Sequence, residues 1–127
     1  MTLYPTVDEV ITVHALLIAQ FGGSLGIRER GALESAIARP QSGYYADIIQ
    51  QTAALWESIS QNPFIDGNKR VAVAVTAAFL RVNGHRLEFN DREAFTFLVN
   101  LYESGRLRFA ELEAWLREHA VPVNPSN

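Results

Sequence analysis

The most constraining stretch of the sequence is the apolar run that follows Arg70. From residue 71 to residue 80 only Thr76 is polar, and valine and alanine predominate. A helix that is apolar on nearly every side belongs in the middle of a bundle. The valines would also suit a strand, but the length of the run and its alanines favour a helix. The sequence therefore predicts a buried central helix over about residues 68–82, with Val73 in its interior.

Five further helices are expected around this one. A capping box formed by Thr6 and Glu9 begins the first helix, and Gly22 and Gly23 end it. Periodic apolar residues and flanking turn residues predict helices over about 29–38, 48–59, 90–105 and 112–119. No strand pattern longer than residues 85–89 is present in the sequence. We expect an all-α fold, a single compact helical bundle over residues 1–120, followed by a loose tail over 121–127.

Composition limits the possible partners. The net charge of −3 over 127 residues gives no electrostatic reason to expect direct binding to nucleic acid. The absence of cysteine excludes disulfides and thiolate chemistry and suits a reducing cytoplasm. The first residues do not resemble a signal peptide, and no apolar stretch is long enough to span a membrane. We therefore expect a cytoplasmic domain that has no membrane partner.

The stretch NPFIDGNKR, residues 62–70, concentrates polar chemistry at the start of the expected central helix. Lys69 and Arg70 fall in its first turn, where the helix dipole disfavours cations by roughly 0.3–1 kcal/mol each. Free backbone N–H groups, a flexible Gly67 and two cations together describe an anion-binding site. Lysine acts there as a point charge, whereas arginine can grip two phosphate oxygens.

The neighbouring side chains refine the type of anion. Asp66 would repel a phosphate unless a divalent cation lay between them, and Mg²⁺ is the usual ion with nucleotides. Asn68 could donate its amide to a phosphate oxygen. The pattern thus predicts a polyphosphate and Mg²⁺ site. The structural alternative is that Asp66 or Asn68 merely caps the helix while Lys69 and Arg70 are solvated.

These residues resemble the motif of the Fic/Doc superfamily, and more closely that of its death-on-curing (Doc) toxin branch. The family motif reads His, any residue, Phe, any residue, Asp or Asn, Gly or Ala, Asn, Lys, Arg. The segments GGSLGIRERGALESAIARPQ, FLRVNGHRLEF and LEAWLREH are also similar to family segments. The resemblance covers residues 6–120 and implies a Fic/Doc-type helical fold.

The resemblance implies a role for each matching position. Phe64 would be a buried anchor and Asp66 the Mg²⁺ ligand. Gly67 and Asn68 would contact the phosphates of ATP or another nucleoside triphosphate. Lys69 and Arg70 would bind phosphate and also act as catalytic residues, since they would stabilise charge on a migrating phosphoryl group.

Two positions favour the Doc branch over the AMP-transferring Fic enzymes. Lys69 stands where those enzymes carry a second glycine, and Val73 stands where they carry another arginine. The Doc resemblance implies transfer of the nucleotide's γ-phosphate to a threonine of elongation factor Tu, which halts translation. It also implies a cognate antitoxin, whose disordered segment folds as a helix into a hydrophobic groove. AMP transfer remains the alternative reaction.

Asn62 departs from the motif, because it occupies the position of the family's catalytic His. An amide can hydrogen-bond an acceptor hydroxyl but cannot take its proton. A general base contributes roughly 10²–10⁴-fold, so the chain as written should be nearly inactive. Two explanations stay open: an inactivating replacement of the base, or the natural residue of a non-catalytic nucleotide-binding or interaction domain.

Other polar and aromatic residues are given structural interpretations. His14 shares an apolar helical stripe and is expected in the core or at its rim, whereas His85 is expected to be exposed and His119 has no expected role. The paired tyrosines 44 and 45 are expected to pack on the surface. We expect the arginines 28, 30 and 39 on a solvated face, the glutamates 34 and 57 exposed, and the tryptophans 56 and 115 in the core.

Overall fold

The structure is a computed structural model that describes residues 1–105 and 107–123. Within these residues it confirms an all-α fold, in which six helices are accompanied by one short 3₁₀ turn and two short strands. The elements in chain order are α1 (Val7–Phe21), α2 (Arg30–Ala38), the 3₁₀ turn η1 (Arg39–Gln41), α3 (Ile48–Ile59), α4 (Asn68–Val82), β1 (His85–Leu87), α5 (Asp91–Ser104), α6 (Phe109–His119) and β2 (Ala120–Pro122).

Local sequence determines where most helices begin and end. Thr6 and Glu9 form the expected capping box, in which the Thr6 hydroxyl accepts the Glu9 N–H and the Glu9 carboxylate accepts the Thr6 N–H. The Asn90 side chain accepts backbone N–H groups at the start of α5, and Gly105 ends that helix with a left-handed backbone. These ends confirm the predicted helices to within one or two residues, except that α6 begins at Phe109.

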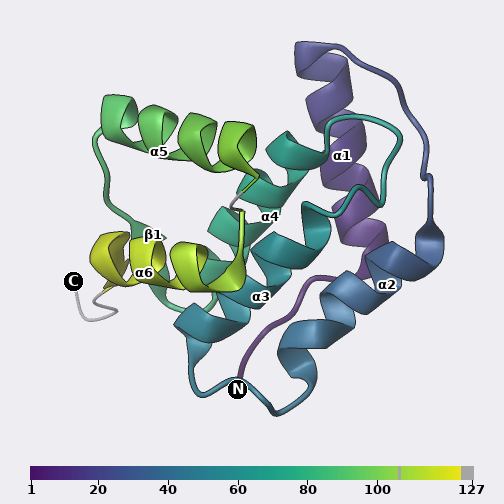
Figure 1. Cartoon of the computed structure of the whole chain (residues 1–127). Coiled ribbons are helices and arrows are strands. Elements are labelled where there is room, and N and C mark those ends of the chain that lie inside the picture. The colour runs from purple at the N-terminus through teal and green to yellow at the C-terminus, as the bar shows by residue number, and fades with distance from the viewer. Residues whose placement is uncertain (106, 124–127) are drawn as a thin grey trace.

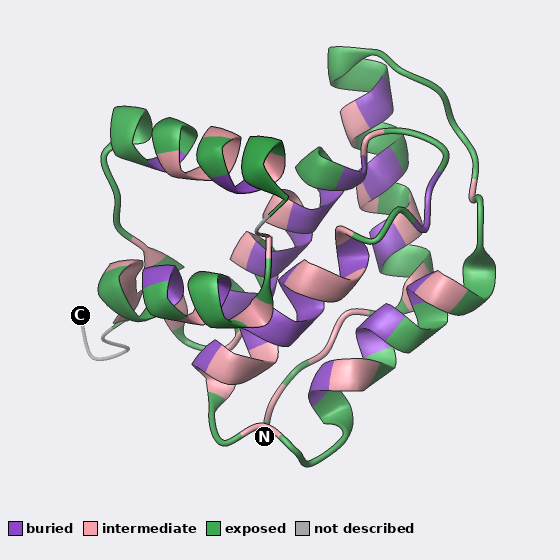
Figure 2. Ribbon diagram, viewed as in Figure 1, coloured by how far each residue is buried: buried purple, intermediate pink, exposed green. Residues whose placement is uncertain are grey.

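Helices α3 and α4 lie side by side in the middle of the molecule (Figure 1). Helix α1 packs on α4, α2 packs on α3, and α6 packs on the other side of α3. The buried residues concentrate on these facing surfaces (Figure 2). Trp56 and Trp115 are both in the core, as expected, with their rings edge to face.

The burial of α4 differs from the prediction in one respect. Val71, Ala72 and Leu80 have no exposed surface, whereas Val73 is only half-buried and Val82 is exposed. The reason is that α5 does not cover the whole side of α4, so Val73 and Ala74 line an apolar groove between α1, α4 and α5. The prediction that Val73 lies in the interior is therefore wrong, although α4 is central.

The strands correct the predicted tail. Strand β1 pairs antiparallel with β2, with Arg86 opposite Val121, and the Val123 N–H donates to the Gly84 carbonyl. Residues 121–123 are therefore part of the fold, and the remainder of the predicted tail, 124–127, lies outside the described residues. His85 belongs to β1 and is half-buried rather than exposed.

Asn83, just before β1, also holds the N-terminal residues of the chain in place. The side-chain amide of Asn83 accepts the Leu3 N–H at 2.8 Å and donates to the Leu3 carbonyl at 2.9 Å. The first residues are thus held against the end of α4 by an amide that pairs like a strand backbone.

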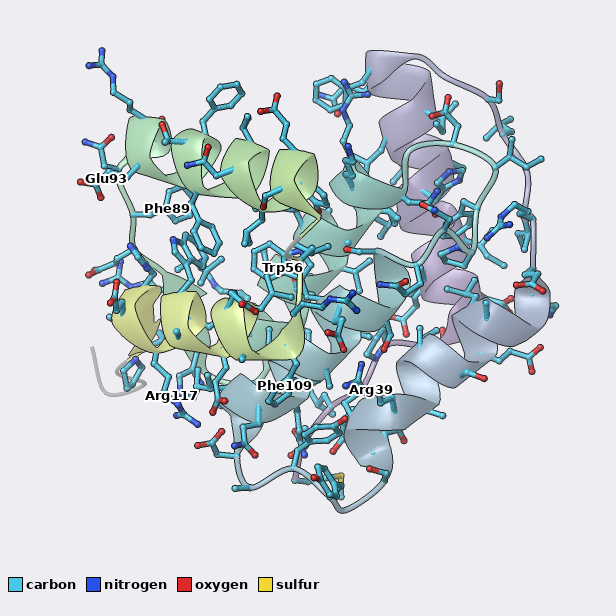
Figure 3. The ribbon with its side chains drawn as sticks, viewed as in Figure 1. Arg39, Trp56, Phe89, Glu93, Phe109 and Arg117 are labelled. Atoms are coloured by element: carbon cyan, nitrogen blue, oxygen red, sulfur yellow. The ribbon has the colours of Figure 1, made fainter. Side chains whose placement is uncertain are left out.

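Glu57 and Arg39 correct two further expectations. The two side chains form a partly buried ion pair at 2.7 Å, and the second carboxylate oxygen of Glu57 accepts the Phe109 N–H. Arg39 and Phe109, two members of this network, are labelled in Figure 3. Glu57 therefore satisfies a backbone donor at the start of α6 instead of pointing into water. Tyr45 accepts a hydrogen bond from Arg39 and packs against Phe109. Tyr44 is exposed, as expected for a tyrosine on the surface.

No helix in the described ranges has the length and apolar character that crossing a bilayer requires.

Candidate phosphate-binding site

The motif loop, defined here as residues 62–67, joins the end of α3 to the start of α4. Gly67 has a left-handed backbone with φ of 75° and stands at the N-cap of α4. A Cβ atom at this position would lie 3.2 Å from the Ile18 side chain and 3.5 Å from that of His14. Both the backbone angle and the close approach to α1 therefore favour glycine.

His14, in α1, supports the motif loop. Its side chain is only 2% exposed, and its ring lies 3.9 Å from the Phe64 ring with an angle of 6° between their planes. Its Nε2 atom lies 2.7 Å from the Asp66 carbonyl oxygen. A carbonyl only accepts, so Nε2 carries the proton and donates. His14 is a core histidine, as predicted, but its role in supporting the loop could not be read from its helical position.

Asn68 is the second support of the loop. Its side-chain oxygen accepts the Phe64 N–H at 2.9 Å, and its side-chain nitrogen donates to the Phe64 carbonyl at 3.0 Å. The side chain is nearly buried, and these bonds occupy its oxygen and one of its two N–H donors. Its main contribution is therefore to shape the loop, and its backbone N–H remains at the open end of the helix.

Asp66 projects from the loop into solvent as a carboxylate. One oxygen accepts the Ser24 N–H at 3.1 Å and the other accepts the Gly67 N–H at 2.8 Å. These two bonds, together with the charge of Arg70, lower the pKa of Asp66 below its usual value. The segment around Gly23 packs directly on this carboxylate, since a Cβ there would lie 2.7 Å from Oδ2. Asp66 is thus oriented and negatively charged at neutral pH.

The N-terminus of α4 carries no side-chain cap from the described residues. Asp66 accepts the N–H of Gly67, and Asn68 bonds to Phe64, so neither side chain satisfies the first turn of the helix. The cap alternative is therefore wrong, and the first-turn N–H groups have no side-chain partner among the described residues at the positive end of the dipole.

Lys69 and Arg70 lie in this first turn and each rests on an aromatic ring. The Lys69 Nζ lies 4.7 Å from the centre of the Tyr102 ring, and the Arg70 guanidinium carbon lies 4.7 Å from that of Phe21. These cation–π contacts orient the two side chains without neutralising them. Both cations therefore remain available to an anion.

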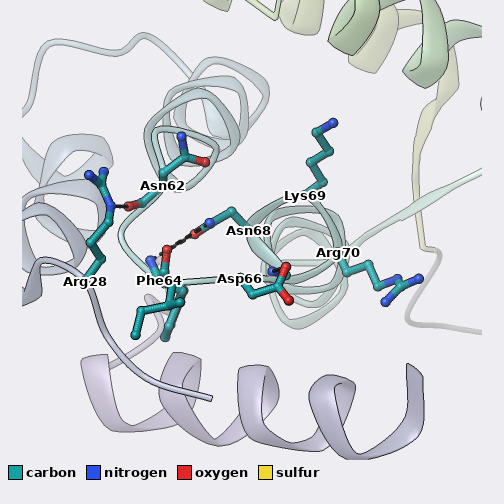
Figure 4. A pocket seen from close by; sticks show the side chains of 9 residues that line it. Arg28, Asn62, Phe64, Asp66, Asn68, Lys69 and Arg70 are labelled. Carbon is teal, nitrogen blue, oxygen red and sulfur yellow. Dashed lines mark hydrogen bonds between the residues drawn. The ribbon is translucent and has the colours of Figure 1, made fainter. Parts of the chain in front are cut away.

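A polar cleft of about 730 Å³ opens above the motif loop (Figure 4). Its lining carries three cations and one carboxylate, namely Arg28, Lys69, Arg70 and Asp66. The cleft is locally cationic even though the whole chain is acidic. The structure thus brings together all six predicted site residues, and it adds Arg28 from the segment before α2, which was predicted to be merely solvated.

Asn62 lies at the edge of this cleft with a left-handed backbone, φ 62°. Its carbonyl accepts a hydrogen bond from the Arg28 Nε at 2.9 Å, and its side chain is exposed. Asparagine and histidine are both enriched at left-handed positions relative to other side chains. The backbone at residue 62 is accordingly compatible with histidine as well as with asparagine.

The site is compatible with Mg²⁺ bound together with phosphate. The described residues contain no group of three or more His, Cys, Asp or Glu side chains able to hold a metal by themselves. Mg²⁺ with nucleotides typically uses one or two carboxylates, phosphate oxygens and water. The exposed carboxylate of Asp66 beside an uncapped helix fits that arrangement.

The fold and the cleft define a class of protein: a helical domain that presents an uncapped helix N-terminus, with an oriented carboxylate and cations beside it. The Fic/DOC family matches residues 4–80, more than half of the chain. The chain is also 38% identical over 93 residues to Toxin Doc of Mycolicibacterium smegmatis, across 68% of this chain and 69% of that protein. It therefore belongs to the Fic/DOC family, whose enzymes are transferases that use nucleotide substrates.

Proposed function

We propose that this chain is the toxin of a toxin–antitoxin system, with the active site of a Doc-type protein kinase acting in the cytoplasm. Its substrate would be a threonine of elongation factor Tu, and its phosphate donor would be ATP or another nucleoside triphosphate with Mg²⁺. The similarity to Toxin Doc supports the toxin assignment. The observation that carries the reaction is the uncapped, cationic start of α4, and the resemblance to the Doc branch implies that Lys69 in this turn favours γ-phosphate transfer over AMP transfer.

Several residues of the cleft would bind the phosphates together. The first-turn N–H groups and Arg70 would hold the phosphate chain, and Lys69 would place a charge beside the group that is transferred. Asp66 would hold the Mg²⁺, whose charge neutralises the oxygens of neighbouring phosphates. Positioning and electrostatic stabilisation of this kind supply most of the catalysis in phosphoryl transfer.

The reaction needs one group that this chain lacks. The threonine oxygen would attack the terminal phosphorus, the bond to the nucleoside diphosphate would break, and the hydroxyl proton would have to leave. Asn62 lies in the cleft where a base would take that proton, but an amide cannot accept it. We therefore propose that the chain binds nucleotide and has little activity. The same residue supports the second candidate, a non-catalytic nucleotide-binding domain.

The antitoxin would occupy the apolar groove of about 530 Å³ between α1, α4 and α5. This groove adjoins Lys69 and Arg70, so a helix bound there would also reach the mouth of the cleft. Its apolar lining suits the hydrophobic face of an amphipathic helix and includes Leu17, Phe21, Val73, Ala74, Phe95, Leu98 and Val99.

The test restores the missing base with the variant Asn62→His. Purified variant, Mg²⁺ and elongation factor Tu are incubated with ATP labelled either at the γ- or at the α-phosphate. We expect γ-label on a threonine at a rate roughly 10²–10⁴ times that of the unchanged chain, and growth arrest in cells without antitoxin. Label from the α-phosphate alone would indicate AMP transfer. No label from either ATP, with nucleotide binding intact, would favour the non-catalytic domain.

A further inference from the structure

Arg28 is attached to the motif loop through both its backbone and its side chain. Its N–H donates to the Pro63 carbonyl at 2.8 Å, and its Nε donates to the Asn62 carbonyl at 2.9 Å. The preceding residue, Ile27, forms an antiparallel bridge with Phe64. The bonds made by its backbone N–H and by its Nε therefore hold the guanidinium at the edge of the cleft beside residue 62.

The rest of the guanidinium is available to a ligand. The two arginines that follow it in the chain have carboxylate partners: Arg30 pairs with Glu34, and Arg39 pairs with Glu57. No carboxylate in 1–105 or 107–123 pairs with Arg28, and Arg28 is one of the residues that line the cleft. An arginine fork with its Nε anchored and its two Nη groups open matches the geometry of a phosphate.

The position of Arg28 differs from that of the other two cations. In Figure 4, Arg28 lies with Asn62 on one side of the loop, and Lys69 and Arg70 lie on the other, with Asp66 between them. A terminal phosphate bound at the start of α4 would therefore have Lys69 on one side and Arg28 on the other. We infer that Arg28 is a further binding residue of this site and that it contacts the terminal phosphate of the nucleotide. The inference depends on the proposed function, which places the transferred phosphate next to residue 62.

The test compares phosphate chains of different length on matched variants. Titration calorimetry with Mg²⁺ measures the binding of ATP, ADP and inorganic tripolyphosphate to the unchanged chain and to Arg28→Gln, Arg28→Lys and Arg30→Gln. We expect Arg28→Gln to weaken ATP binding about ten- to a hundredfold, and to weaken ADP binding less than about threefold. Arg28→Lys should be intermediate because it keeps the charge but loses the fork. Arg30→Gln removes an equal charge outside the cleft and should change nothing.

Each other outcome decides against the inference. Equal losses for ATP and ADP would mean that Arg28 acts only by supporting the backbone at Asn62. Unchanged ATP binding by Arg28→Gln would overturn the inference alone and leave the proposed function standing. If the unchanged chain binds neither ATP nor tripolyphosphate, the phosphate site itself is wrong, and the inference is overturned together with the proposed function.

Discussion

His14 and Phe64 lie face to face, with ring centres 3.9 Å apart and ring planes 6° from parallel. The residues are fifty positions apart in the chain, and their contact joins α1 to the motif loop. The imidazole also donates to the carbonyl of Asp66, the residue whose carboxylate is proposed to hold Mg²⁺. One buried side chain thus positions both the apolar anchor and the charged residue of the loop.

His14→Ala should therefore damage both stability and binding. It removes the ring that supports Phe64 and leaves the Asp66 carbonyl without its donor, which together should cost about 2–4 kcal/mol of unfolding free energy. His14→Gln can keep a donor and should cost less. Urea denaturation followed by circular dichroism measures the free energy of unfolding of both variants. Leu16→Ala, on the same helix and 64% exposed, is the control; equal midpoints for all of these proteins would contradict the supporting role.

The two faces of α4 should respond differently to charge. Val71→Asp would place an unpaired carboxylate at a position with no exposed surface, and a cost of several kcal/mol is large against a total stability of about 5–15 kcal/mol. Val73→Asp points into the groove, where the carboxylate can reach water. We expect the first variant to be unfolded and the second to keep a helical spectrum and a cooperative melt. If Val73→Asp also unfolds, the groove is not open as described.

The lowered pKa of Asp66 predicts how the stability of the folded chain depends on pH. The N–H groups of Ser24 and Gly67 lower its pKa in the folded state, so its ionised form stabilises the loop at neutral pH. That contribution is fully present above the usual carboxyl pKa of 3.8 and is lost as the pH falls through the lowered value. The difference in melting temperature between the unchanged chain and Asp66→Asn should be constant from pH 7 to pH 5 and shrink below about pH 4. A difference that grows on acidification would contradict the assigned bonds.

Glu57→Gln tests the network that holds the start of α6. The substitution removes the charge that pairs with Arg39 and weakens the bond to the Phe109 N–H, and we expect a loss of about 1–3 kcal/mol. Glu34→Gln disrupts an exposed pair with Arg30 and should cost under about 1 kcal/mol. Thermal unfolding of the two variants gives the comparison directly. Equal effects would mean that the partial burial of Glu57 adds nothing.

The helices could be predicted from the sequence because their ends are encoded locally. The bond from Thr6 to Glu9 spans three residues, and the cap of α5 lies within Asn90–Glu93. The β1–β2 pairing could not be predicted in this way, because it joins residues more than thirty positions apart through very short segments. The same limit explains Val73, whose exposure depends on where α5 lies across α4 and not on its own periodicity.

The candidate site was predictable where its residues are contiguous. Residues 62–70 carry the motif, and the helix start explains their chemistry. The supports of the loop come from elsewhere: His14 from α1, and Ser24 and Arg28 from the segment between α1 and α2. None of them forms a pattern with the motif in the sequence. Only the fold shows that these residues meet.

The amide of Asn83 and the carbonyl of Gly84 fix Leu3 and Val123 at the same end of α4. The cleft lies at the opposite end of that helix, about 22 Å away for its fifteen residues. A fluorophore or surface tether attached near either of these two positions would emerge on the far side from the nucleotide. Single-molecule or immobilised binding assays could therefore be built on this chain with the cleft left open to solution.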